Sequence, residues 1–392
     1  MTIGMVAPEI LAPAGNLDKL MTACRYGADA VYVGGPRFGL RSGAENFSDE
    51  ELEAGVVFAH GKGAKVYVTL NAFLHERDLE GLAEYSGVLQ EIGVDALIVS
   101  DPGVMDILAK SCKIPLHVST QATCLNGSQA RLWKSLGATR IITGRELSLE
   151  EGAKLGESSG LEVEMFVMGA MCSAYSGHCT ISNYTAGRDS NRGGCKQSCR
   201  FDFKMDGKTE SRALMSSRDL NGLEHLEQAN NLGIDSLKIE GRMKSNLYVA
   251  GATKAFREAL VAVQKGEEVP GRCRELLNAF SNRGYTEASL AEGEAGPESI
   301  AGDTSQSGPK FAWAGQVVSV TESNAYVQLK NPLMRGDLLE VLSFEGENFF
   351  LKTDSLEDYE GASLEKGKQE SILRFPKNGL EVGMILRKVG SS

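Results

Sequence analysis

The chain has no long apolar run and no N-terminal targeting pattern. None of its segments approaches the ~18 apolar residues that a membrane-spanning helix needs. The opening residues, MTIGMVAPEI, lack the basic region followed by an apolar run that marks a signal peptide. We therefore expect a cytoplasmic protein that does not act at a membrane.

Sequence patterns of several enzyme classes are also missing. No G-x-G-x-x-G follows a β-rich run, no H-E-x-x-H occurs, and the five histidines are dispersed without a pair spaced for a metal. The formal net charge of −11 argues against non-specific binding along nucleic-acid backbones. Dinucleotide binding by a doubly wound sheet and zinc-protease chemistry are therefore disfavoured.

Cysteine, in contrast, is concentrated in one segment. Cys172, Cys179, Cys195 and Cys199 fall within 28 residues, separated by six, fifteen and three residues. In a reducing compartment clustered cysteines indicate a metal site rather than disulfides. The other four, at positions 24, 112, 124 and 273, lie in helical or strand contexts, where cysteine behaves as a small buried hydrophobe.

Four thiolates can complete the coordination of a [4Fe–4S] cluster or of a structural zinc ion. Zinc sites usually pair ligands about two to four residues apart, and only Cys195 and Cys199 are paired in this way. The glycine-rich gap before Cys195 carries basic residues that would offset a cluster's negative charge. The pattern favours iron–sulfur, with zinc and free or redox-active thiols as alternatives. A radical-type cluster would need a cysteine where Asp202 stands.

A local excess of positive charge follows the cysteines. Residues 188–218 contain eight Lys and Arg against four Asp and Glu. This segment could hold an anionic substrate or a phosphate backbone, or it could only balance the cluster, and both readings stay open. The candidate substrate-binding residues here are Arg188, Arg192, Lys196 and Lys204.

Short β-rich runs alternate with amphipathic helical segments over the first two thirds of the chain. This alternation specifies a parallel sheet with crossover helices. Eight such runs match an α/β fold of the (β/α)8 TIM-like barrel type better than an open sheet. The predicted strands are 9–14, 30–35, 65–73, 96–101, 116–122, 140–147, 162–171 and 236–243.

Barrel enzymes place their chemistry at the C-terminal ends of the strands. Candidate catalytic residues at these ends are Arg145, Glu240 and Arg242, and candidate substrate-binding residues are Asn71 and Gln121. An arginine there can clamp a carboxylate through two hydrogen bonds. The alternative is that these polar residues only brace the barrel.

We divide the chain into a barrel over residues 1–295, with the iron–sulfur insertion at 172–199, a linker over 296–309 and a small all-β barrel domain over 310–392. The linker is rich in Gly, Ser and Pro, and short strands without helices follow it. A hairpin after the cysteines is expected to turn at Asp206–Gly207.

The cysteine segment itself is recognisable. EMFVMGAMCSAYSGHCTIS (164–182) resembles the signature of the collagenase-like peptidase U-32 family. Further resemblances to that family are EILAPAGN (9–16), GADAVYVGG (27–35), SSRDL (216–220) and IEGRMKS (239–245). Together they extend over essentially the whole chain.

The resemblance implies a function that the family name does not suggest. Members with this cysteine pattern are implicated in oxygen-independent hydroxylations that depend on a [4Fe–4S] cluster, and the family's cluster ligands map to Cys172, Cys179, Cys195 and Cys199. The segment is most similar to the branch that forms 5-hydroxyuridine at the tRNA wobble position, with prephenate as oxygen donor and an unidentified electron donor. Alternatives are an rRNA hydroxylase, a peptidase and a non-catalytic RNA-binding protein.

Overall fold

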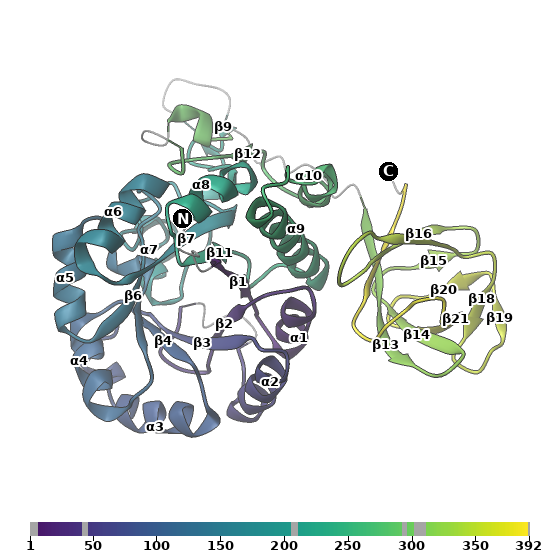
Figure 1. Cartoon of the computed structure of the whole chain (residues 1–392), viewed down its shortest axis with the longest axis horizontal. Coiled ribbons are helices and arrows are strands. Elements are labelled where there is room, and N and C mark those ends of the chain that lie inside the picture. Colours follow the sequence, from purple (N-terminus) through teal and green to yellow (C-terminus); the bar gives the residue numbers. More distant parts are fainter. Residues whose placement is uncertain (1–6, 41–45, 205–210, 292–295, 302–310, 391–392) are drawn as a thin grey trace.

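The computed structural model describes residues 7–40, 46–204, 211–291, 296–301 and 311–390. They form a (β/α)8 barrel and, beside it, a smaller all-β domain, as predicted (Figure 1). No helix in these ranges is both long and apolar enough to cross a membrane.

Eight parallel strands of the described chain close the barrel. Each strand from β1 to β7 pairs with the next along the chain, and β11 closes the ring by pairing with both β7 and β1. All eight strands predicted from the sequence are present. They are β1 (Glu9–Pro13), β2 (Ala30–Gly34), β3 (Lys65–Leu70), β4 (Ala96–Val99), β5 (Leu116–Val118), β6 (Ala138–Ile142), β7 (Glu162–Ala170) and β11 (Ser236–Ile239).

The sequence of each strand explains its place in the ring. β2 (AVYVG) and β4 (ALIV) are buried at every residue, because helices cover the outer face of a parallel sheet and side chains fill its interior. Serine capping boxes start two of the covering helices, since Ser48 and Ser148 each exchange hydrogen bonds with a glutamate three residues later. The main helices are α1 (Leu17–Arg25), α2 (Asp49–Gly61), α3 (Leu82–Ile92), α4 (Pro102–Ser111), α5 (Gly127–Ser135), α6 (Leu149–Ser159), α8 (Leu226–Asn231), α9 (Asn246–Gln264) and α10 (Gly271–Asn278).

Charged side chains fill the barrel interior toward the N-terminal ends of the strands. Arg140 Nη1 lies 2.7 Å from Glu9 Oε1 and 3.4 Å from Glu164 Oε2, and Lys238 Nζ lies 2.7 Å from Glu164 Oε1. Burial lowers the pKa of the Arg140 guanidinium, but Glu9 and Glu164 outweigh burial and raise it. We call Glu9, Arg140, Glu164 and Lys238 the interior ion network, in which every member has a partner of opposite charge.

The long connection from β7 to β11 carries the cysteines. It contains α7 (Ile181–Ala186) and an antiparallel pair, β8 (Phe203–Lys204) with β9 (Ser211–Arg212). This pair is the hairpin expected from the sequence, and its expected turn at Asp206–Gly207 lies outside the described residues. The connection also adds β10 (Asp219–Asn221), which runs antiparallel to β7 and pairs with β12 (Tyr285–Thr286).

The second domain is an antiparallel sheet with its own apolar core. β14 alternates buried and half-buried residues along its length, as expected for a strand with one face toward the core. The strands are β13 (Ala312–Val320), β14 (Asn324–Leu329), β15 (Leu333–Met334), β16 (Leu338–Leu342), β17 (Phe349–Lys352), β18 (Leu356–Asp358), β19 (Ser363–Leu364), β20 (Lys366–Gly367), β21 (Ile372–Pro376) and β22 (Ile385–Lys388).

Specific hydrogen bonds join the two domains. The buried Tyr26 hydroxyl donates to Leu342 O and accepts from Ile385 N, while Lys254 Nζ donates to Ser343 O and Gly346 O at 2.8 Å each. Of the expected linker, residues 302–309 lie outside the described residues. Residues 296–301 lie against the barrel, where Ile300 forms a bridge with Ser217.

Candidate active site at the mouth of the barrel

A cavity of about 200 Å³ opens at the C-terminal ends of the barrel strands. The cysteine segment after β7 forms part of its wall. The structure therefore brings residues far apart in the sequence to one site. Of the candidates predicted from the sequence, the cavity is lined by Asn71, Gln121, Arg145, Cys172, Cys179, Cys195, Cys199, Glu240 and Arg242.

Arg145 lies between the cysteines and the barrel interior. Its guanidinium stacks over the Phe166 ring, 4.2 Å from the ring centroid. Nη1 lies 3.5 Å from Cys172 Sγ, and Nη2 lies 3.9 Å from Glu240 Oε2. Nε is buried without a hydrogen-bond partner. Arg145 is thus oriented by its neighbours and keeps a donor unused.

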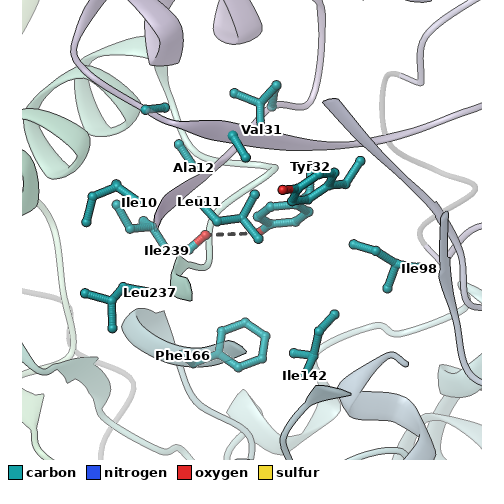
Figure 2. Packing of buried hydrophobic residues seen from close by; sticks show 14 of the residues in the cluster. Ile10, Leu11, Ala12, Val31, Tyr32, Ile98, Ile142, Phe166, Leu237 and Ile239 are labelled. Atoms are coloured by element: carbon teal, nitrogen blue, oxygen red, sulfur yellow. Dashed lines mark hydrogen bonds between the residues drawn. The ribbon is translucent and has the colours of Figure 1, made fainter. Parts of the chain in front are cut away.

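Glu240 is held in place by two tyrosines. The Tyr32 hydroxyl lies 3.2 Å from Glu240 Oε2 and 3.1 Å from Ile239 O, and the Tyr248 hydroxyl donates to Glu240 O at 2.9 Å. Figure 2 shows Tyr32 and Phe166 around the space enclosed by the strands. A Cβ at Gly169 would lie 2.4 Å from Glu240 O, so only glycine allows this close approach. The Glu240 carboxylate therefore has a fixed place in the wall.

Arg242 is more deeply embedded than Arg145. It is only 5% exposed, and Nη2 donates to Asn46 Oδ1 at 2.9 Å. Gly34 provides space for it, because a Cβ there would lie 2.1 Å from Arg242 Nη2. These contacts favour bracing of the mouth as the role of Arg242, and leave Arg145 as the better placed of the two to contact a ligand.

Several polar atoms in the cavity wall are buried without a hydrogen-bond partner. Among the described residues they include Thr120 Oγ1, Gln121 Oε1, Arg145 Nε and Ser190 Oγ. Asn71, in contrast, donates to Ser119 Oγ at 3.1 Å and accepts from Leu40 N at 3.3 Å. Since the great majority of buried polar groups in proteins are paired, unpaired atoms gathered in one cavity indicate a place for a polar ligand.

The four cysteines face this same cavity. Cys172 and Cys195 are exposed, and Cys179 and Cys199 are half-buried. Burial raises the pKa of the Cys199 thiol, Arg200 lowers it, and the thiols of the other three cysteines raise it further, so the four lie within electrostatic reach of one another. Within the described residues no group of three or more His, Cys, Asp or Glu is arranged to hold a metal ion. The donors thus suit a four-thiolate group in number, and all four line one cavity.

The predicted basic residues separate into two kinds. Arg188, Lys196 and Lys204 are exposed. Arg192, however, lies with Nη2 2.7 Å from Asp78 Oδ2 and donates from Nη1 to Phe73 O. Arg192 therefore fastens the cysteine segment to the barrel, and its charge is already paired.

Lys238, Tyr32 and Phe166 also line the cavity, although sequence reasoning did not select them. Lys238 Nζ lies 4.3 Å from the centroid of the Tyr32 ring and connects the cavity floor to the interior ion network. A lysine between the apolar residues Leu237 and Ile239 could have signalled a buried charge. Its partner, Glu164, lies on a different strand and could not be identified from spacing.

The sequence matches a known family in both domains. Residues 15–298 match peptidase family U32, and residues 310–387 match the C-terminal domain of peptidase family U32. The chain belongs to peptidase family U32, as the cysteine segment predicted.

Curated relatives carry names from three kinds of activity. The tRNA hydroxylation protein P1 of Bacillus subtilis is 38% identical over 94% of this chain and 91% of its own length. The 23S rRNA 5-hydroxycytidine C2501 synthase of Escherichia coli is 35% identical over 87% of this chain and 53% of its own length. A collagenase of Porphyromonas gingivalis is 30% identical over 71% of this chain and 72% of its own length. Of these three relatives, the one that is covered over more than nine tenths of both chains is named for tRNA hydroxylation.

Proposed function

We propose that this protein is a tRNA hydroxylase that converts uridine to 5-hydroxyuridine at the wobble position without O2. The observation that carries the proposal is the cavity at the barrel mouth, where four cysteines meet Arg145, Glu240 and buried polar atoms without partners. The similarity to the tRNA hydroxylation protein of Bacillus subtilis over nearly the full length supports tRNA as the substrate.

The size of the cavity supports a small reacting group. At about 200 Å³ it is smaller than the roughly 300–1,000 Å³ typical of pockets for drug-sized ligands. A single base can enter such a space if the nucleotide is turned out of its stack, as enzymes that act on bases require. The sequence contains no H-E-x-x-H metalloprotease motif, which disfavours the peptidase alternative.

The reaction replaces C5–H of uracil by C5–OH, which oxidises the base by two electrons. The oxygen donor must be reduced by the same two electrons, so its C–O bond breaks and a C–H bond replaces it. We propose prephenate or a similar dicarboxylate for this role. Cys172, Cys179, Cys195 and Cys199 would hold a [4Fe–4S] cluster, which would pass the two electrons from the base to the oxygen donor. An electron-transfer partner would be needed only to bring the cluster to its active oxidation state.

The residues of the chain supply binding and proton transfer. Arg145, already oriented by Phe166 and Glu240, clamps a donor carboxylate. Glu240 Oε2, held by the Tyr32 hydroxyl, accepts the C5 proton. The rings of Tyr32 and Phe166 form an apolar part of the wall that excludes water from the reacting atoms.

RNA must bind at a restricted surface because the whole chain is acidic. Arg188, Lys196 and Lys204 supply exposed positive charge on the segment that carries the cysteines. Each phosphate contact that is lost should reduce the slope of log binding constant against log salt by about one. Replacement of Arg188, Lys196 and Lys204 by alanine should therefore weaken tRNA binding and reduce this slope. The matched control is replacement of Lys366 and Lys368, exposed lysines of the second domain, by alanine, which should leave the slope unchanged.

The test is nucleoside mass spectrometry of tRNA and rRNA from a strain that lacks the gene and its paralogues. We expect 5-hydroxyuridine and its derivatives to disappear from tRNA while rRNA is unchanged. Intact tRNA together with loss of a hydroxylated rRNA nucleoside would transfer the assignment to rRNA. Unchanged RNA, with peptide hydrolysis by the purified protein that Cys172→Ala abolishes, would favour the peptidase.

A further inference from the structure

The cysteine segment exposes large aromatic side chains instead of burying them. Tyr184 is 89% exposed and Tyr175 is 61% exposed. An aromatic residue usually buries roughly 150–250 Å² of surface on folding. Tyr175, which lines the cavity, and Tyr184, on the same connection, forgo most of that gain, which indicates that they contact something other than their own chain.

Tyr175 projects from a part of the rim that is fixed on both sides. The next residue, Ser176, donates from its backbone N to Glu146 Oε1 at 2.8 Å, and its Oγ accepts from Arg145 N at 3.0 Å. A Cβ at Gly177 would lie 2.0 Å from Gln121 O, so the backbone there lies directly against the wall. Because Tyr175 also lines the cavity, its exposed ring stands on a rigid support at the entrance.

Tyr184 lies on α7, and hydrogen bonds of neighbouring residues anchor that helix. Thr185 Oγ1 donates to Ser198 Oγ at 2.7 Å, and Ser182 Oγ lies 3.4 Å from the same atom. Lys196 N also donates to Ser182 Oγ at 3.1 Å, which ties the helix to the turn between Cys195 and Cys199. These contacts hold α7 in place while Tyr184 faces solvent.

We propose that Tyr175 and Tyr184 form a stacking surface for unpaired nucleotides. Tyr175 stacks on the base at the cavity entrance, and Tyr184 stacks on a flanking nucleotide. Arg188, Lys196 and Arg212 on the same connection are exposed and positively charged, which favours an RNA strand with its phosphates over an apolar protein partner. This inference rests on the proposed function and specifies its substrate as RNA with an unpaired loop.

Stacking and phosphate contact make different predictions, because only unpaired bases offer their faces. Base–aromatic stacking is worth about 1–3 kcal/mol, equivalent to roughly 5- to 150-fold in affinity. Tyr175→Ala and Tyr184→Ala should each weaken binding of an anticodon stem–loop RNA by about tenfold or more. Binding of a fully paired RNA of equal length should stay within about twofold, and Tyr→Phe at either position should restore loop binding.

The experiment is fluorescence anisotropy with these two RNAs and the full chain over a range of salt concentrations. Tyr359→Ala is the matched control, since Tyr359 is 65% exposed but lies on the second domain. Lys196→Ala should weaken binding of both RNAs and reduce the salt slope, whereas the tyrosine variants should leave the slope unchanged.

The outcomes separate this inference from the proposed function. Loop binding by Tyr175→Ala and Tyr184→Ala equal to the wild type, in a protein that hydroxylates tRNA, would overturn the stacking surface and leave the function standing. Equal weakening of loop and duplex would also overturn it, because the tyrosines would then act on the fold or on the backbone contact. Unchanged tRNA in the strain that lacks the gene and its paralogues would instead refute the proposed function itself.

Discussion

The two ends of the barrel interior handle polar groups in opposite ways. Toward the N-terminal ends of the strands, the members of the interior ion network are paired with one another. At the C-terminal mouth, Gln121 Oε1, Arg145 Nε and Ser190 Oγ are buried without partners. The ion network is paired within the protein alone, whereas the mouth contains buried polar atoms that no other group of the described chain pairs.

This difference distinguishes buried polar groups that stabilise the fold from buried polar groups that are available to a ligand. A buried ion pair with good geometry persists because removal of one partner leaves the other uncompensated. Unpaired buried polar atoms cost stability and are uncommon in native structures, so a group of them in one cavity is expected only where they have a use. His117 Nδ1 is the exception near the ion network, because it is buried and also has no partner.

The largest predicted effect concerns the metal. Protein purified without oxygen should contain about four iron per chain. Cys172→Ala, Cys179→Ala, Cys195→Ala or Cys199→Ala should each abolish the cluster and all hydroxylation. The controls are Cys24→Ala and Cys273→Ala, because burial raises the pKa of those thiols to about 12 and about 11 and keeps them protonated. Iron and sulfide analysis with an absorption spectrum makes the measurement, and stoichiometric zinc without iron would refute it.

The second prediction compares the two ends of the barrel directly. Glu164→Gln should reduce the free energy of unfolding by about 3–5 kcal/mol, because Arg140 and Lys238 would lose a fully buried counter-charge. Gln121→Ala at the mouth should change it by less than about 1 kcal/mol, since its side-chain oxygen has no partner to lose. Urea unfolding of both variants is the test. Similar losses of unfolding free energy in the two variants would contradict the difference between the interior ion network and the mouth.

The third prediction divides the two mouth arginines. Arg145→Ala should raise KM for the dicarboxylate donor by roughly 10- to 150-fold, the loss expected for a hydrogen bond of about 1.5–3 kcal/mol to a charged group. Its free energy of unfolding should change little. Arg242→Ala should instead destabilise the fold, because it empties the space beside Gly34 and leaves Asn46 unpaired. Steady-state kinetics and urea unfolding on both variants separate the roles, and wild-type turnover in Arg145→Ala would show that it too only braces the barrel.

The smallest effect depends on pH and concerns His117. Burial, together with Arg140 and Lys238, lowers the pKa of this histidine well below 6.5, so it stays neutral in the folded protein. The unfolded chain binds a proton below about pH 6.5, and the wild type should lose up to about 1.4 kcal/mol of stability per pH unit as pH falls below that value. His117→Phe should be less sensitive to acid over the same window. Urea unfolding at pH 7.5 and 5.5 is the measurement, and identical pH dependence would contradict it.

The sequence was sufficient for most of the fold. Buried apolar runs such as ALIV and the Ser48 and Ser148 capping boxes are local patterns, and all eight barrel strands followed from such patterns. β10 and β12 were not predicted, because each is only two or three residues long and is defined by pairing with distant segments.

The candidate site was predictable in part. Residues at the ends of barrel strands meet in any such barrel, so Arg145, Glu240 and Arg242 could be selected from the topology. What could not be predicted is which charges are already paired. The salt bridge from Arg192 to Asp78 and that from Lys238 to Glu164 join residues on different elements, and only the packed structure brings them together.

The most direct test of the mouth as an active site is anaerobic modification of tRNA by the purified protein. Iron-loaded wild type would be incubated with unmodified tRNA, prephenate and a reductant, and the nucleosides analysed by mass spectrometry. We predict a uridine heavier by one oxygen atom at the wobble position, absent with Cys172→Ala and strongly reduced with Arg145→Ala. An unchanged tRNA in the presence of protein that holds its full iron would contradict the assignment.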